Sequence, residues 1–225
     1  MTAARPPRDV TAPVEDYLKV IYEIERRSDV ATTNDIAQRL AIAPASVSGM
    51  VRRLADQGLL EHEPYRGVRL TGMGRRLALR TLRRHRVIEA YLTLALGYPW
   101  DLVHDEAERL EHAASDALID RMAAAIGEPE TDPHGAPIPT REGEIDERTL
   151  FSILDLAPGE RGRVVRVSDD DAAMLRYLGE LGLTIGVEVT VQSREPYGGP
   201  IALRVGQVQR QIGPALAAAV LVETG

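Results

Sequence analysis

The spacing of apolar residues near the start of the chain predicts three short helices. In the first helix these residues recur three and four positions apart, which is the period of an amphipathic helix: Val14, Tyr17, Leu18, Ile21 and Tyr22. A second helix begins at the capping residues 33–35, and after a short turn a third begins at Pro44 and ends near Gly58. Two short helices joined by a tight turn form the helix-turn-helix pattern.

The outward residues of the third helix are small or basic, as close approach to a DNA groove and its phosphates requires. The candidate DNA contacts on this helix are Pro44, Ala45, Ser46, Ser48, Gly49, Arg52 and Arg53. Two strands predicted at 59–63 and 67–70 then form a hairpin wing, whose tip residue Arg66 could contact a phosphate or the minor groove. This order predicts a winged-helix DNA-binding domain, and a plain helical hairpin with a small, charged outer face is the alternative.

A charged stretch further along the chain predicts a metal site. Four of its side chains fall in one helical stripe or at its edge, because they are separated by steps of four, three and one: His104, Glu108, Glu111 and His112. His85 and Glu89 lie four positions apart in the long helix predicted after Thr71. Three of the five histidines lie in these two segments. Such groups could hold a divalent metal, and a solvated charged face is the alternative.

The two helices that carry these groups are also rich in Leu and Ala. The second of them is predicted to run unbroken to about Ile126. Together they would leave an apolar face uncovered in a lone subunit, for which a symmetric dimer is the commonest remedy. A dimer also suits paired half-sites on DNA.

In the last third of the chain, the helical pattern gives way to a proline-rich segment and then to predicted strands. Four prolines between 127 and 143 predict a linker or an ordered non-helical crossing, in which Asp132 and His134 could donate two more ligands or lie in a solvated turn. From Thr149 onward, short alternating strands with glycine turns suggest a small barrel, within which the acids 169–171 cap a short helix.

Composition restricts the class of protein. The chain has 225 residues, of which 44% are hydrophobic and 27% charged, as is typical of a soluble globular protein. It has no cysteine, so any metal must be bound through oxygen and nitrogen. No apolar run approaches the ~20 residues that span a bilayer, and residues 1–13 lack the apolar core of a secretory signal. We therefore expect a cytoplasmic protein that does not enter a membrane.

The net charge of −7 is unevenly distributed. Residues 1–86 carry a net charge of +6, and residues 87–225 carry −13. This asymmetry suggests a polyanion as partner of the first part and cation chemistry in the second.

The sequence resembles the diphtheria-toxin-repressor family of metal-dependent transcriptional regulators over nearly its full length. The matching motifs include Glu15-Asp16-Tyr17-Leu18, Arg84-His85-Arg86, Val103-His104-Asp105-Glu106-Ala107, Glu111-His112 and Pro133-His134-Gly135. The resemblance implies a mainly α fold with small β parts. It implies three domains: a winged helix-turn-helix at 1–74, a helical dimerisation and metal-binding domain at 75–148 with a crossing at 127–148, and an SH3-like, FeoA-type β-barrel at 149–225.

The resemblance also implies the ligands and the metal. The iron-responsive branch has methionine and cysteine where this chain has Asp16 and Glu108, whereas the manganese-responsive branch has carboxylates there. Oxygen ligands suit hard Mn²⁺, and Fe²⁺ is the alternative. The implied principal site consists of Asp16, His85, Glu108, Glu111 and His112. The implied second site consists of Glu89 and His104, with help from Asp132, His134, Asp169, Asp170 and Asp171.

Lys19 departs from the family pattern, because the small manganese regulators have a glutamate at this position. A lysine three residues from Asp16 places positive charge where a closely spaced second cation would lie. We therefore expect two separated single-ion sites and no tight two-metal cluster.

The expected function is that of a Mn²⁺-dependent repressor, a homodimer that binds a double-stranded DNA operator of metal-homeostasis genes and is not an enzyme. An Fe²⁺-responsive regulator of the same fold is the first alternative. A winged-helix regulator of an organic ligand and a carboxylate-bridged metalloenzyme are the others, although the chain lacks the His-Glu-x-x-His motif.

Overall fold

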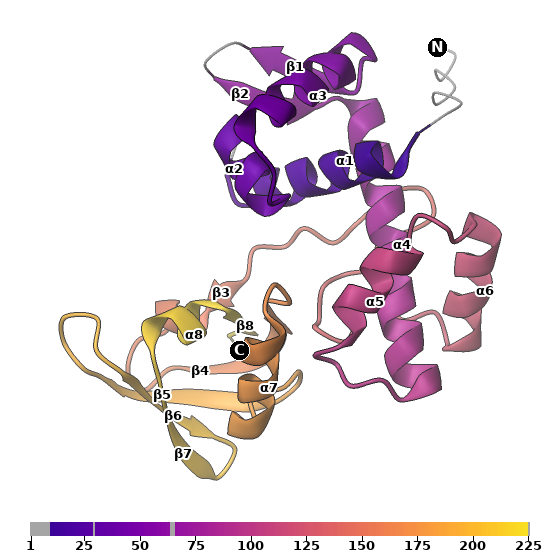
Figure 1. Ribbon diagram of the computed structural model, residues 1–225. Coiled ribbons are helices and arrows are strands. Elements are labelled where there is room, and N and C mark those ends of the chain that lie inside the picture. Colours follow the sequence, from indigo (N-terminus) through magenta and orange to yellow (C-terminus); the bar gives the residue numbers. More distant parts are fainter. Residues whose placement is uncertain (1–9, 29, 64–65, 225) are drawn as a thin grey trace. The chain divides into compact units, whose positions relative to one another are not determined.

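The computed structural model describes residues 10–28, 30–63 and 66–224, and it divides the chain into two compact units (Figure 1). The first unit comprises Met1–Arg84, Glu111–Ala113 and Pro139–Glu144. The second comprises His85–Leu110, Ala114–Ile138 and Ile145–Gly225. The three-domain boundaries expected from the sequence stay a prediction.

The first unit contains the winged helix-turn-helix. It has α1 (Ala12–Glu25), α2 (Thr33–Arg39) and α3 (Pro44–Asp56), followed by the antiparallel strands β1 (Leu60–Glu63) and β2 (Gly67–Leu70). Thr32 and Asp35 form a capping box at the start of α2, which satisfies backbone N–H groups that a helix leaves free. The apolar stripe forms a buried core: Leu18, Ile21, Tyr22, Ile36, Val47 and Leu54.

The helices that follow include one break that the sequence did not predict. The long helix α4 (Gly72–Leu96) begins after Thr71, whose hydroxyl accepts a hydrogen bond from the Gly74 amide. The single helix expected to run to about Ile126 is instead two, α5 (Val103–Leu110) and α6 (Asp116–Ala125). Ser115 caps α6 by accepting a hydrogen bond from the Leu118 amide, so a new helix begins there.

The crossing is ordered and buried, which excludes the solvated turn considered for Asp132 and His134. Asp132 Oδ1 accepts hydrogen bonds from the amides of His134 and Ala136, each at 2.9 Å. Gly135 has a φ of +82°, and an added Cβ would lie 1.9 Å from the Val165 carbonyl oxygen, so only glycine fits. The His134 carbonyl accepts from the Val167 amide at 2.9 Å, which joins the crossing to the C-terminal sheet.

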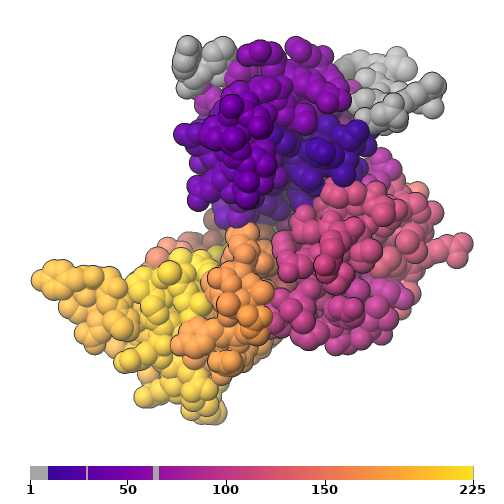
Figure 2. Space-filling view, viewed as in Figure 1, coloured from indigo at the N-terminus to yellow at the C-terminus, as the bar shows by residue number. Residues whose placement is uncertain are grey.

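The C-terminal part is a six-stranded antiparallel sheet with strand order β3-β8-β4-β5-β6-β7. Its elements are β3 (Phe151–Ser152), the 3-10 helix η1 (Ile153–Asp155), β4 (Arg161–Val167), α7 (Ala172–Leu181), β5 (Glu188–Arg194), β6 (Ile201–Val205), β7 (Val208–Ile212), α8 (Pro214–Ala218) and β8 (Val220–Glu223). Leu175 and Leu178 of α7 are buried in the same core as the strands. The loop between β5 and β6 projects from the sheet (Figure 2).

This architecture confirms the expected fold class. A winged helix-turn-helix, a helical part and a small C-terminal β domain follow one another along the chain. Among the described helices, none is long and apolar enough to cross a membrane.

Candidate metal centres

Asp16, Glu111 and His112 form the first cluster, which lies within the first unit. Asp16 is on α1, and the other two residues follow the end of α5. His112 Nε2 lies 2.8 Å from Asp16 Oδ1 and 3.4 Å from Glu111 Oε1. One ligand atom from each residue falls within 4.8 Å of the others, as the ligands of one metal ion require.

Lys19 contributes a positive charge to this cluster, as its sequence position suggested. Its Nζ lies 2.6 Å from Glu111 Oε1, and both side chains are buried. Burial raises the pKa of Asp16, although the charges of His112 and Lys19 oppose the shift. The first cluster therefore combines two carboxylates, one imidazole and one ammonium group.

His112 is held through both ring nitrogens. Nε2 faces Asp16, and Nδ1 lies 2.7 Å from Glu15 Oε2. Burial lowers the pKa of His112, but the hydrogen bond to Glu15 and the charge of Asp16 outweigh it and leave the pKa above its usual value. The sequence did not indicate Glu15, since only its proximity to Asp16 in the chain hinted at a place near the site.

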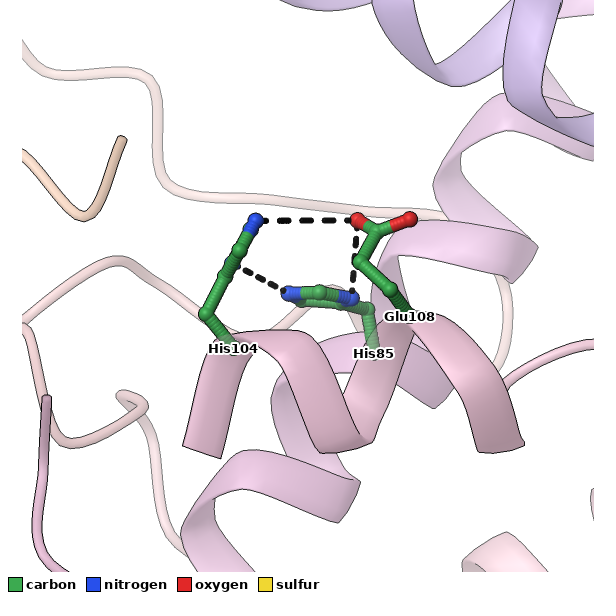
Figure 3. A group of neighbouring side chains, drawn as sticks. All are labelled: His85, His104 and Glu108. Atoms are coloured by element: carbon green, nitrogen blue, oxygen red, sulfur yellow. Dashed lines mark hydrogen bonds and ion pairs between the residues drawn. The ribbon is translucent and has the colours of Figure 1, made fainter. Parts of the chain in front are cut away.

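His85, His104 and Glu108 form the second cluster, which lies within the second unit (Figure 3). His85 is on α4, whereas His104 and Glu108 lie one turn apart on α5. Glu108 Oε1 is 3.5 Å from His85 Nδ1 and 3.8 Å from His104 Nε2. His85 Nε2 is 3.2 Å from His104 Nδ1. The three side chains point toward one another, as Figure 3 shows.

Glu89, His134 and Asp169 form the third cluster, also within the second unit. The side chains of Glu89 and His134 are fully buried. His134 Nδ1 lies 3.9 Å from Glu89 Oε1 and 4.0 Å from Asp169 Oδ2. Glu89 Oε1 also lies 3.0 Å from His85 Nε2, so this carboxylate borders both the second and the third cluster.

Three buried polar atoms of this region lack a hydrogen-bond partner among the described residues. They are Glu89 Oε2, Asp132 Oδ2 and His134 Nδ1. Buried polar atoms are nearly always satisfied, and a bound ion is one explanation for exceptions. Asp132 Oδ2 lies 3.5 Å from Arg86 Nε, so a positive charge already faces it. A carboxylate oxygen and an imidazole nitrogen are metal ligands, so Glu89 and His134 of the third cluster fit a bound divalent cation.

The surroundings shift the pKa values of two carboxyl groups of this region in opposite directions. Burial would raise the pKa of Glu89, but the adjacent His85 and His104 hold it well below its usual value. Burial, together with the charge of Glu89, raises the pKa of Asp132 to about 6. Glu89 is therefore ionised at neutral pH, and Asp132 titrates close to neutrality.

The structure groups the implied ligands differently from the sequence. Of the implied principal site it brings together Asp16, Glu111 and His112, and it groups His85 and Glu108 with His104. Of the implied second site it brings together Glu89, His134 and Asp169. Asp170 accepts a hydrogen bond from Ser168, and Asp171 caps α7. The complete ligand sets stay predictions.

The candidate DNA-contacting residues lie on the surface of the winged helix. On α3, Val47, Val51 and Leu54 are buried, whereas all seven candidates are exposed: Pro44, Ala45, Ser46, Ser48, Gly49, Arg52 and Arg53. Arg66 between the wing strands is exposed as well. The face that the sequence assigned to DNA is accessible within its unit.

Comparison with known proteins covers nearly the whole chain. Residues 9–68 match the N-terminal DNA-binding domain of iron-dependent repressors, residues 71–140 match their metal-binding and dimerisation domain, and residues 151–224 match the FeoA domain. The diphtheria toxin repressor of Corynebacterium efficiens is 32% identical over 226 residues, which cover 96% of this chain and 97% of that protein. The iron-dependent repressor IdeR of Mycobacterium tuberculosis is 32% identical over 221 residues, covering 93% and 96%.

A solved structure is similar as well. It is described as a manganese-dependent transcriptional repressor in complex with manganese, and it is 38% identical with a TM-score of 0.89, covering 94% of this chain and 100% of that chain. The chain thus belongs to the diphtheria-toxin-repressor family and is a metal-dependent, DNA-binding transcriptional repressor with a C-terminal FeoA domain.

Proposed function

We propose that this repressor responds to Mn²⁺, which acts as corepressor, and that a homodimer binds double-stranded operator DNA of metal-homeostasis genes. The observation that carries the choice of metal is the composition of the first cluster, where Asp16, Glu111 and His112 offer only oxygen and nitrogen. Such ligands suit hard Mn²⁺, whereas sulfur would favour softer metals. The similar structure that contains manganese supports the same choice.

The first cluster would couple cation binding to the DNA-binding domain. Asp16 lies on α1, whose residues pack into the helix-turn-helix core, and Glu111 and His112 lie at the end of α5. A bound cation supplies the positive charge that pairs both carboxylates. By sharing it, Asp16, Glu111 and His112 would fix α1 to the segment that leaves α5. Without it, the DNA-competent arrangement would be only fractionally populated and DNA affinity would be lower.

One further ion would bind in the second unit, at either the second or the third cluster. His85, His104 and Glu108 form one candidate set, and Glu89, His134 and Asp169 form the other. Because Lys19 already pairs with Glu111, the first cluster would hold a single ion.

The experiment that tests this function measures DNA affinity against metal concentration. A duplex is first selected from a random pool with the full chain and Mn²⁺, and its binding is then followed by fluorescence anisotropy with Mn²⁺, Fe²⁺ or no metal. We expect Mn²⁺ to tighten binding at a lower free concentration than Fe²⁺. By linkage, the DNA should tighten Mn²⁺ binding by the same factor. Equal affinity with and without metal would overturn the proposal.

An Fe²⁺-responsive regulator is the second candidate, because the iron-dependent repressors are relatives at 32% identity. It predicts the opposite order of the two metals in the same titration.

The variant Asp16→Ala should lose the metal response but remain folded, whereas Glu180→Ala, which removes an exposed carboxylate from α7, should keep it.

The DNA face is tested through Arg52, which is exposed on α3. We expect Arg52→Ala to weaken DNA binding and, if the side chain contacts a phosphate, to reduce the slope of log affinity against log salt by about 1. Arg121→Ala removes an exposed arginine from α6 and should change neither quantity. An unchanged DNA affinity in Arg52→Ala would show that Arg52 does not contact the DNA.

A further inference from the structure

Glu15, a carboxylate outside the first cluster, contacts His112 from the side opposite to Asp16. Glu15 precedes Asp16 on α1, and its Oε2 lies 2.7 Å from His112 Nδ1. The other ring nitrogen, Nε2, lies 2.8 Å from Asp16 and 3.4 Å from Glu111. The ring is therefore held between Glu15 on one side and the two candidate ligands on the other.

Glu15 is itself fixed by a cation. Its Oε1 lies 3.1 Å from Arg84 Nη1, and both side chains are largely buried. The two oxygens of Glu15 thus have separate partners, Arg84 and His112. Glu15 faces Nδ1 of His112, on the side of the ring away from Asp16, and it does not belong to the first cluster.

This arrangement selects one ring nitrogen as the ligand. A carboxylate can only accept a hydrogen bond, so Nδ1 must carry a proton to bond Glu15. By the same rule, Nε2 donates its own proton to Asp16 Oδ1, 2.8 Å away, in the metal-free chain. A cation bound by Asp16 and Glu111 would displace the proton of Nε2, whereas Glu15 would keep the proton on Nδ1, so Nε2 would be the ligand atom. Metal-binding histidines commonly donate their other N–H to a carboxylate, which fixes the tautomer and the orientation of the ring.

We propose that Glu15, held by Arg84, is a positioning residue that keeps Nδ1 of His112 protonated and aims Nε2 at the metal position. Glu15 does not bind the metal, and it acts only through His112. The inference rests on the proposed function for its consequence in metal binding, but its structural part concerns the metal-free protein alone.

The first test reads the tautomer of His112 without metal. Long-range ¹H–¹⁵N spectra of the metal-free, ¹⁵N-histidine-labelled chain are recorded at a pH high enough for the ring to be neutral. The His112 signals are assigned by their loss in His112→Gln. We expect the Nδ1–H tautomer in the wild type and a shift toward the Nε2–H tautomer in Glu15→Ala. An unchanged tautomer in Glu15→Ala would overturn the proposal.

The second test measures Mn²⁺ affinity by calorimetry on the full chain. Loss of such an outer carboxylate typically weakens metal binding ~10- to 100-fold, and we expect a loss of this size in Glu15→Ala. Glu23→Ala is the matched control, because it removes another carboxylate of α1 that pairs with an arginine, Arg39. Arg84→Lys should retain most of the affinity, since a cation still faces Glu15.

The outcomes separate this inference from the proposed function. If Glu15→Ala changes the tautomer but the wild type binds no Mn²⁺, the proposed function fails and the positioning role stands. If the wild type binds Mn²⁺ and Glu15→Ala binds it equally well, the positioning role fails. If Glu23→Ala weakens binding as much as Glu15→Ala, the effect is a general one of α1 and the positioning role also fails.

Discussion

Lys19 is a buried positive charge beside a group of candidate metal ligands. Its ammonium nitrogen lies 2.6 Å from Glu111 Oε1, and Glu111 is fully buried. A buried ion pair is strongly coupled, because loss of one partner leaves the other charge without compensation. At the same time, an ammonium group at this distance repels any cation that approaches Glu111.

Substitution of Lys19 by methionine should therefore have two opposite effects. The metal-free protein should lose stability, by about 3 kcal/mol if the pair behaves as other buried pairs do. Mn²⁺ should bind more tightly, because the repulsion is gone. Thermal unfolding with and without Mn²⁺ measures both, and Lys19→Arg, which keeps the charge, should resemble the wild type. Unchanged Mn²⁺ affinity in Lys19→Met would show that the charge does not limit the site.

Asp132 should make the stability of the metal-free protein depend on pH. Its pKa of about 6 in the folded chain exceeds its usual value of 3.8, so the folded state binds the proton more tightly than the unfolded state. The resulting stabilisation is complete below pH 3.8 and is lost as the pH rises through about 6. Asp132→Asn should flatten this part of the profile while Oδ1 still accepts from the amides of His134 and Ala136.

The measurement for Asp132 is the melting temperature of the metal-free chain at a series of pH values from acid to neutral. Asp56→Asn, at an exposed position of α3, is the control and should retain the wild-type slope. The same slope in Asp132→Asn as in the wild type would assign the pH dependence to other groups.

At the scale of elements, the crossing and the sheet depend on each other. Residues 132–137 are largely buried, and Gly135 lies so close to the Val165 carbonyl that no side chain can be added. Trp100, from the turn between α4 and α5, packs against the core of the sheet, and its carbonyl oxygen lies 2.8 Å from His134 Nε2. The position of His134 is therefore set by packing from both sides.

Gly135→Ala should destabilise the chain more than a matched glycine substitution. Gly127 has nearly the same φ, +83°, but nothing lies within 4 Å of an added Cβ. Gly127→Ala should cost only the backbone strain of roughly 1–2 kcal/mol. Gly135→Ala adds the steric clash and should lower the melting temperature further. Equal melting temperatures would show that the crossing shifts away from the sheet at little cost.

The sequence predicted elements well and their mutual placement poorly. Apolar spacing located α1, capping residues located α2, Pro44 with apolar spacing located α3, and two predicted strands around a turn located the wing, because these signals are local. The break between α5 and α6 was missed, since Ala113 and Ala114 favour a helix and Ser115 alone marks the cap. Local signals cannot show which residues of different helices meet, so the grouping of His85 with His104 was not foreseen.

Burial of the crossing was unpredictable for the same reason. Asp132 and His134 belong to a proline-rich segment that by composition could equally be solvated. Their burial follows from contacts with residues far along the chain, such as Val167. Likewise, the role proposed for Glu15 depends on its ion pair with Arg84, which is 69 positions away in the sequence.

At the scale of the whole molecule, exposed leucines on the helices suggest where two copies meet. Leu94 and Leu96 on α4 and Leu118 on α6 are each about half exposed or more. This region falls within the residues that match a dimerisation domain. Apolar side chains in such numbers are usually covered by another chain.

Leu94→Glu should weaken the dimer, because a charge would have to be buried against the partner. Sedimentation velocity at a series of concentrations should show a shift toward monomer, together with lower affinity for the selected duplex. Val208→Glu, at a similarly exposed apolar position of the sheet domain, is the control and should leave the dimer intact. A dimer of unchanged strength in Leu94→Glu would place the interface elsewhere.

The anchoring of the crossing to β4 has a practical corollary for fragment design. A shortened chain that stops before the sheet would remove the Val167 amide and Asp169, both of which lie against His134. His134 in turn lies beside the buried Glu89. Such a fragment would preserve the helix-turn-helix, which belongs to the first compact unit. Measurements on this fragment would not represent the properties of Glu89 in the full chain. Thermodynamic studies of that carboxylate therefore need the intact polypeptide.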